Sequence, residues 1–146
     1  MSENSANPLT LDTSIDEIVE NFQMLEEWDD RYGYLIELGR GLKAMPEGAQ
    51  SDANKVNGCV SQVWVVPVAL EDGTVAFRGA SDAHIVSGLV AIALSLFSGK
   101  RPQEIIATDE QETFRAIGLA DHLTPQRSNG LRAMVARIKT LAQAAA

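Results

Sequence analysis

Residues 60–70 read VSQVWVVPVAL, and residues 71–78 continue as EDGTVAFR. The first segment is rich in β-branched residues, begins with polar alternation and becomes continuously apolar, which predicts a largely buried strand. Asp72-Gly73 is a signal for a tight hairpin turn, so the residues after it supply a returning strand. Pro67 predicts a bulge or a sheet edge. The chain therefore contains at least two antiparallel strands, and a third if the segment before Gly58 also pairs.

Helical patterns flank this hairpin on both sides. Ser14 and Glu17 have the spacing of a capping box, which predicts a first helix. The apolar stripes of residues 85–97 predict a helix buried on most sides, capped by Ser81 or Asp82. Further helices are predicted from Trp28 to about Gly39, over Pro102–Ala107, from Thr108 with a capping box to Gln111, and from Pro125 with Thr124 as N-cap; residues 45–58 are predicted as a loop. The predicted class is α+β, a small antiparallel sheet packed with helices.

Length and charge limit the possible functions. At 146 residues the chain predicts one domain over residues 1–146, with residues 1–13 as a flexible arm. The formal net charge is -8, and all of it falls in residues 1–50, where 11 acids meet 3 bases. This balance argues against nucleic acid and anionic membranes as partners. The acidic first helices are either a docking face or an ordinary solvated surface.

The location is predicted from what the sequence lacks. The longest strongly apolar stretch, residues 85–97, is too short to cross a bilayer, which takes roughly 20 residues. Residues 1–14 resemble neither a signal peptide nor a transit peptide. A single cysteine, Cys59, excludes an intramolecular disulfide and fits a reduced compartment. We therefore expect a cytoplasmic protein.

Cys59 is the candidate nucleophile. A reactive thiol must ionise, which requires a donor, a cation or a metal close by. Gly58 before it allows unusual backbone angles and close approach of a partner. A lone cysteine beside an apolar strand is also commonly an inert core residue. His84 and His122 match no metal-binding spacing, and surface or capping roles are expected for both.

Several segments together resemble the SufE family of sulfur-acceptor proteins. They occur in the family's order from Trp28 to Leu131, and the motifs are WDDRY with LIELG, GCVSQVW, SDA with IVSGL, SG, and LTPQRSNGL. Any one of these motifs is weak evidence alone. Their common order makes the resemblance specific over nearly the whole chain.

The resemblance implies a compact α+β fold similar to IscU-type scaffolds. It places the sulfur-accepting role on Cys59, which would take sulfur from a persulfide on a SufS-like cysteine desulfurase, stimulate that enzyme and pass sulfur to an iron–sulfur assembly scaffold. Thiol exchange needs no cofactor or metal on this chain, and pyridoxal phosphate would belong to the desulfurase. The free protein is expected to be a monomer or a homodimer.

The same motifs supply secondary site residues. Ser61, Gln62, Asp82 and Arg127 are candidates for shaping the cysteine loop and the docking surface, although Asp82 and Arg127 also fit structural roles as a cap or ion pair. The loop is expected to turn Cys59 into a sheltered apolar pocket, because a persulfide is easily oxidised or lost to small thiols. Two positions depart from the family pattern, which favours a polar residue in place of Val60 and a small residue in place of His84.

Two other functions remain open alternatives. A metal or iron–sulfur scaffold of IscU-like fold would need about four thiolate or imidazole ligands, and only Cys59, His84 and His122 are available. A Cys/His hydrolase would need an imidazole within hydrogen-bond reach of Cys59.

Overall fold

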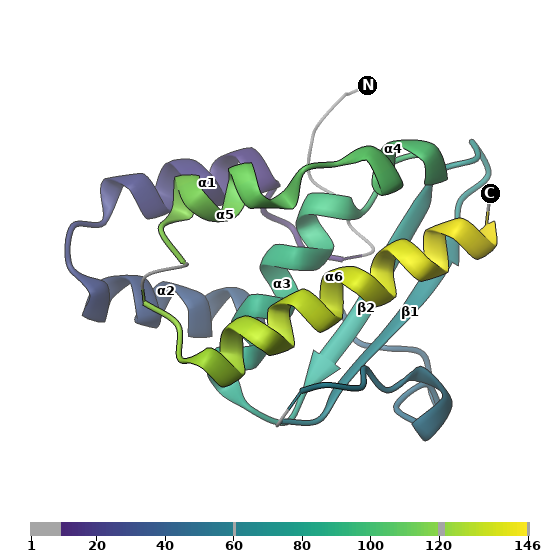
Figure 1. Cartoon of the computed structure of the whole chain (residues 1–146), viewed down its shortest axis with the longest axis horizontal. Coiled ribbons are helices and arrows are strands. Elements are labelled where there is room, and N and C mark those ends of the chain that lie inside the picture. Colours follow the sequence, from purple (N-terminus) through teal and green to yellow (C-terminus); the bar gives the residue numbers. More distant parts are fainter. Residues whose placement is uncertain (1–9, 60, 120–121, 146) are drawn as a thin grey trace.

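The computed structural model describes residues 10–59, 61–119 and 122–145 (Figure 1). Helices pack with a small antiparallel sheet, which confirms the predicted α+β class. In chain order the elements are α1 (Ile15–Met24), α2 (Trp28–Arg40), the 3₁₀ turn η1 (Asp52–Asn54), β1 (Val63–Ala69), β2 (Val75–Ser81), α3 (His84–Phe97), α4 (Pro102–Ala107), α5 (Glu110–Ile117) and α6 (Pro125–Ala145).

Strands β1 and β2 form the hairpin predicted from the sequence. Their register is continuous, with Val63 opposite Ser81 and Ala69 opposite Val75, so Pro67 causes no bulge. Proline has no N–H to donate, and this is harmless here because both strands are edge strands. The predicted third strand does not form in the described part of the chain. The segment before Gly58 pairs with β1 by an isolated bridge between Lys55 and Trp64, not as a strand.

Polar groups of other segments bond to the outer edges of the hairpin. On β1, the Val65 carbonyl accepts hydrogen bonds from the Arg137 guanidinium, at 3.1 Å from Nη2 and 3.3 Å from Nε. On β2, the Phe77 carbonyl accepts from Thr10 Oγ1 at 2.6 Å, and the Phe77 N–H donates to Ser98 Oγ at 3.0 Å. Side chains therefore satisfy edge groups that have no strand partner.

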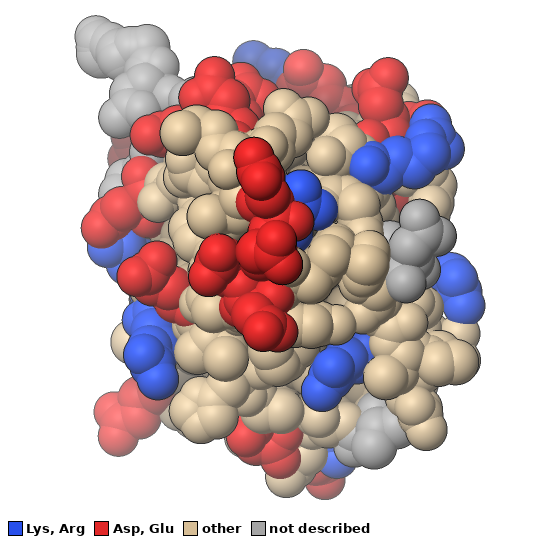
Figure 2. Space-filling model, turned by 90° about the vertical axis from the view of Figure 1, so that its left-hand side faces the viewer, with Lys and Arg blue, Asp and Glu red and all other residues tan. Residues whose placement is uncertain are grey.

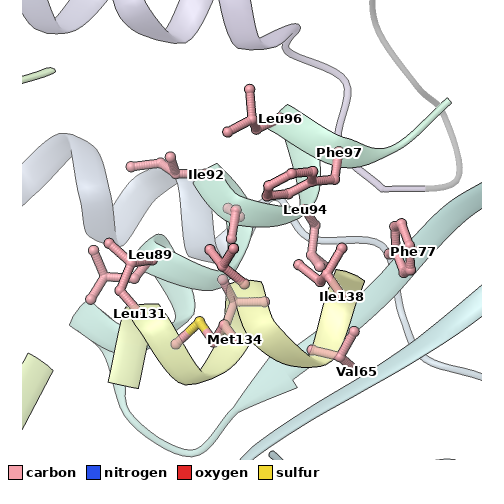
Figure 3. Packing of buried hydrophobic residues seen from close by; sticks show 14 of the residues in the cluster. Val65, Phe77, Leu89, Ile92, Leu94, Leu96, Phe97, Leu131, Met134 and Ile138 are labelled. Atoms are coloured by element: carbon pink, nitrogen blue, oxygen red, sulfur yellow. The ribbon is translucent and has the colours of Figure 1, made fainter. Parts of the chain in front are cut away.

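Helix α3 is the centre of the molecule. It packs against α1, α2, α6 and β2, and ten of its residues are buried, as the two apolar stripes in the sequence predict. Figure 3 shows side chains of α3 meeting Leu131, Met134 and Ile138 of α6, with Val65 and Phe77 of the strands closing the same cluster. One hydrophobic core thus holds the sheet and the helices together.

The N-cap predicted for α1 is confirmed, and the one predicted for α5 is wrong. Ser14 and Glu17 form the capping box of α1. The prediction of a capping box from Thr108 to Gln111 is wrong: Asp109 is the N-cap of α5 and accepts from the Gln111 N–H. Thr108 instead donates to the Glu104 carbonyl and so belongs to the end of α4.

The N-terminal segment joins the core earlier than expected. The predicted arm covers residues 1–13, of which residues 1–9 lie outside the described residues. Thr10 and Leu11 are buried, with Leu11 in the hydrophobic cluster. The packed part of the chain therefore includes Thr10 and Leu11.

Figure 2 shows the end of the molecule at which α1 passes into α2, and acidic side chains run across the middle of this view. Glu26, Glu27, Asp29 and Asp30 are all exposed at this turn. Across the described residues, no helix combines the length and the apolar character needed to cross a membrane.

Candidate functional site

Cys59 lies in the loop before β1 and rests against α6. Gly58 adopts a φ of +96°, a left-handed conformation that favours glycine, and a Cβ built on it would come within 3.3 Å of the Ala133 side chain. Cys59 is partly buried, and its thiol donates a weak hydrogen bond to the Gly130 carbonyl, with 3.6 Å between Sγ and O. The loop therefore lies directly on the small residues of one face of α6.

A second contact fixes the other end of the loop. The Gln62 N–H donates to Asp82 Oδ1 at 3.1 Å, and the Asp82 N–H donates to the Gln62 carbonyl at 3.2 Å. The prediction that Ser81 or Asp82 caps α3 is therefore wrong: the N-cap is Ala83, without a side-chain cap bond. The Asp82 carboxylate is used by the cysteine loop instead.

A pocket of about 450 Å³ opens beside the thiol. Cys59 forms part of its wall, together with residues of α3 and of the first turns of α6. Its apolar lining comes from Ala83, Ile85, Val86, Leu89 and Met134. Its polar lining comes from Ser61, His84, Thr124, Gln126 and Arg127. The thiol thus lies between an apolar surface and a polar one.

Burial and charge act on the Cys59 thiol in opposite directions. Burial raises the pKa of the Cys59 thiol above its usual value, because the thiolate loses solvation there. Among the described residues lining the pocket, Arg127 carries a positive charge and none is acidic. A thiolate or persulfide formed there would face the Arg127 guanidinium and hydroxyl groups.

The structure brings the predicted site residues together in two groups. Ser61 and Arg127 line the pocket with Cys59. Gln62 and Asp82 bond to each other beside the pocket, outside its described wall. Of the two departures from the family pattern, Val60 lies outside the described residues and His84 lines the pocket.

Gly130, Thr124 and Gln126 also line the pocket, although their sequence motif did not predict them as site residues. A Cβ on Gly130 would lie 3.4 Å from Cys59 Sγ, so the glycine leaves room for the thiol. A glycine inside a helix lowers stability by about 1 kcal/mol relative to alanine, so Gly130 in a helical pattern was the one local signal of a close contact. The proximity itself joins residues 71 positions apart, which no local pattern reveals.

His122 lies elsewhere. Its imidazole stacks on the Trp28 ring, at the end of the molecule where α2 begins. Within residues 10–59, 61–119 and 122–145, no group of three His, Cys, Asp or Glu side chains is placed to hold a metal ion.

Comparisons with known proteins agree with this structure. The family model described as SufE, Fe-S metabolism associated domain, matches residues 16–142. An uncharacterized SufE-like protein of Rhizobium meliloti is 54% identical over 90% of this chain and 96% of its own length. A second one, of Rhizobium etli, is 50% identical over 86% of this chain and 87% of its own.

The fold has a counterpart among solved structures. The solution structure of a hypothetical protein from Thermus thermophilus matches with a TM-score of 0.72 at 22% identity, covering 90% of this chain and 94% of that one. At that identity the match shows the fold alone. With the family model and the two relatives, the chain belongs to the SufE family and has a role in iron–sulfur metabolism.

Proposed function

We propose that this protein is a sulfur carrier that accepts persulfide sulfur on Cys59 from a SufS-like cysteine desulfurase, stimulates that enzyme and delivers the sulfur to an iron–sulfur assembly scaffold. The observation that carries the proposal is the position of the chain's only cysteine, partly buried at the wall of a pocket and resting on Gly130. Family membership places the protein in iron–sulfur metabolism. A reduced cytoplasm suits a carrier that works through a free thiol.

The transfer is an exchange of one sulfur–sulfur bond for another. The Cys59 thiolate attacks the outer sulfur of the donor persulfide, a new S–S bond forms on Cys59, and the original S–S bond breaks. The donor's inner sulfur leaves as a thiolate and takes up the proton that the Cys59 thiol has lost. Nothing is oxidised or reduced overall, so the step needs no cofactor on this chain. Pyridoxal phosphate belongs to the desulfurase.

The pocket supports both the protection and the release of the sulfur. Its apolar residues exclude water and small thiols from a carried persulfide, whose outer sulfur is otherwise open to oxidation. The side chain of Arg127 offers a charge-assisted hydrogen bond to the persulfide anion. Gly58, in its left-handed conformation, is the position about which the loop turns when Cys59 moves toward a partner.

The docking surface surrounds this loop. We assign to it Ser61 and Arg127, which line the pocket, and the exposed Gln62–Asp82 pair next to it. These residues lie on the cysteine loop, on the segment between β2 and α3 and on α6, so a partner that contacts them would also contact the loop.

The test uses a purified SufS-like cysteine desulfurase with L-cysteine and records sulfide release together with the intact mass of this protein. The wild type is expected to stimulate release and to gain one sulfur atom, about 32 Da, while Cys59→Ser does neither. Equal stimulation by Cys59→Ser with no mass gain in the wild type would overturn the proposal.

A matched control moves the thiol along the same loop. The double variant Cys59→Ser with Ser61→Cys keeps one cysteine on the pocket wall but removes it from Gly130. Sulfur acceptance is expected to fall well below that of the wild type. A double variant that accepts sulfur as well as the wild type would contradict the role given to the position of Cys59.

A further inference from the structure

Two residues on neighbouring turns of α2 hold a single residue of the α5–α6 connection. The Trp28 ring stacks on the His122 imidazole, with 3.8 Å between the centroids and 22° between the planes. One turn further along α2, Tyr32 Oη donates to the His122 carbonyl at 2.6 Å. His122 is therefore fixed through both its side chain and its backbone.

The beginning of the connection is fixed by the same helix. Arg31 lies over the Trp28 ring, 5.0 Å from its centroid, and donates from Nη1 to the Ile117 carbonyl at 3.4 Å. Gly118 ends α5 in a left-handed conformation with a φ of +82°. A Cβ there would come within 3.3 Å of Arg31 Nη1 and 3.7 Å of the Trp28 ring. The chain therefore turns closely around these two side chains of α2.

The connection leads directly into one wall of the cysteine pocket. Thr124 is two residues after His122, and its Oγ1 accepts from the Arg127 N–H at 3.3 Å at the start of α6. Thr124 and Arg127 both line the pocket, and the next turn of the helix carries Gly130 under the thiol. Thr124 and Gln126 are exposed, and the buried residues of α6 begin only at Gly130.

We propose that Trp28 and Tyr32 are positioning residues for Cys59. By holding His122 they fix the first turn of α6, and this turn fixes Arg127 and the pocket wall against which the thiol rests. The inference rests on the proposed function, because it assigns these residues to the step in which Cys59 receives sulfur. Releasing His122 moves this wall and exposes the thiol.

The test measures the alkylation of Cys59 by iodoacetamide, which reports on the pocket without a desulfurase because the chain has one cysteine. Trp28→Leu is expected to raise the second-order rate constant of alkylation about tenfold, which corresponds to the free energy of one lost aromatic pair. Tyr32→Phe keeps the ring and removes the bond to His122, so about threefold is expected. All rates are measured well below the unfolding temperature of each variant.

Two matched variants separate positioning from general stability. Trp28→Phe keeps an aromatic ring against His122 and is expected to restore a rate near that of the wild type. Tyr34→Phe removes another hydroxyl from α2, one that accepts from Asn21 and does not contact His122. Its alkylation rate is expected to be unchanged, even where its free energy of unfolding falls.

Fluorescence gives an independent readout of the stack. In a Trp64→Phe background Trp28 is the only tryptophan, and the imidazole stacked 3.8 Å from its ring is expected to quench its emission. Tyr32→Phe releases the His122 carbonyl and is expected to weaken this quenching, so that the emission rises. Unchanged alkylation in both Trp28→Leu and Tyr32→Phe would overturn the inference, whereas failure of the wild type to accept sulfur would overturn the proposed function instead.

Discussion

Gly88 on α3 and Gly130 on α6 both bring another segment close to a helix backbone, but the two segments differ. A Cβ on Gly88 would lie 2.2 Å from the Leu35 carbonyl oxygen and 3.0 Å from its Cα, which are backbone atoms of α2. A Cβ on Gly130 would lie 3.4 Å from Cys59 Sγ, the end of a side chain on a loop. The first neighbour cannot move without separating two helices, while the second can. One glycine therefore serves the fold and the other serves the thiol.

The largest effect is expected at the helix contact. Gly88→Ala forces α2 and α3 apart, because overlap with backbone cannot be relieved by a rotamer change, and we expect a loss of at least about 3 kcal/mol in the free energy of unfolding. Urea denaturation measures it. Gly33→Ala on α2 is the control: nothing lies within 4 Å of the added methyl, so a gain of about 0.5–1 kcal/mol is expected. A Gly88→Ala protein as stable as the wild type would remove the distinction between the two glycines.

At Gly130 the expected effect is on reactivity. Gly130→Ala places a methyl group 3.4 Å from Sγ, at van der Waals contact, and we expect this group to weaken the bond from the thiol to the Gly130 carbonyl and to shift Cys59 outward. The free energy of unfolding is expected to stay within about 1 kcal/mol of the wild type, since alanine also favours the helix. The rate of alkylation by iodoacetamide is expected to rise about fivefold, equivalent to roughly 1 kcal/mol. A destabilised protein with an unchanged rate would contradict this interpretation.

Asp82 holds the same loop from the other side, and a smaller effect is expected there. Asp82→Ala removes the bond to the Gln62 N–H, so the loop should open more often and alkylation of Cys59 should rise about twofold to threefold. Glu71→Ala removes an exposed carboxylate at the far end of the hairpin and serves as the control. An equal response in both variants would show a general charge effect and not a loop contact.

The smallest expected effect is on the pH dependence of Cys59 alkylation and of the free energy of unfolding. Because burial raises the pKa of the Cys59 thiol, alkylation is expected to increase with an inflection above that of an ordinary thiol, and Gly130→Ala should move this inflection down. The folded chain holds the proton more tightly than the unfolded one. The free energy of unfolding should therefore fall as the pH rises above the unfolded value, about 8.5, through the raised folded value. Urea denaturation at several pH values should show a weaker fall in Cys59→Ser, and an equal fall would contradict the raised pKa.

Local signals in the sequence predicted much of the fold. The Ser14–Glu17 box, the Asp72-Gly73 turn and the apolar stripes of α3 each depend on residues a few positions apart, and all three are found in the structure. The prediction of Thr108 as the N-cap of α5 was wrong because Asp109, one residue later, offers a carboxylate for this role. The prediction of Asp82 as a cap of α3 was wrong because its carboxylate accepts a hydrogen bond from the Gln62 N–H, 20 residues away.

The candidate site shows the same division. Cys59 was identified from its residue type and its motif, and Ser61 and Arg127 from the motifs alone. The surface on which the thiol rests was not predicted, because the contact to Gly130 depends on how α6 crosses the cysteine loop. That crossing depends on core packing through Met134 and Ile138. Many apolar sequences share the same helical pattern, so the pattern alone does not predict how the helix crosses the loop.

The side chains that bond to the edges of the hairpin have a consequence for association. A two-stranded sheet has no interior strand, so both outer rows of peptide groups can pair with an extended chain from another molecule. Arg137 and Thr10 occupy the carbonyls of Val65 and Phe77, where such a chain would begin to pair. Removing the Arg137 side chain should therefore lower the solubility of concentrated protein more than it lowers the free energy of unfolding, because strands of different molecules can then pair.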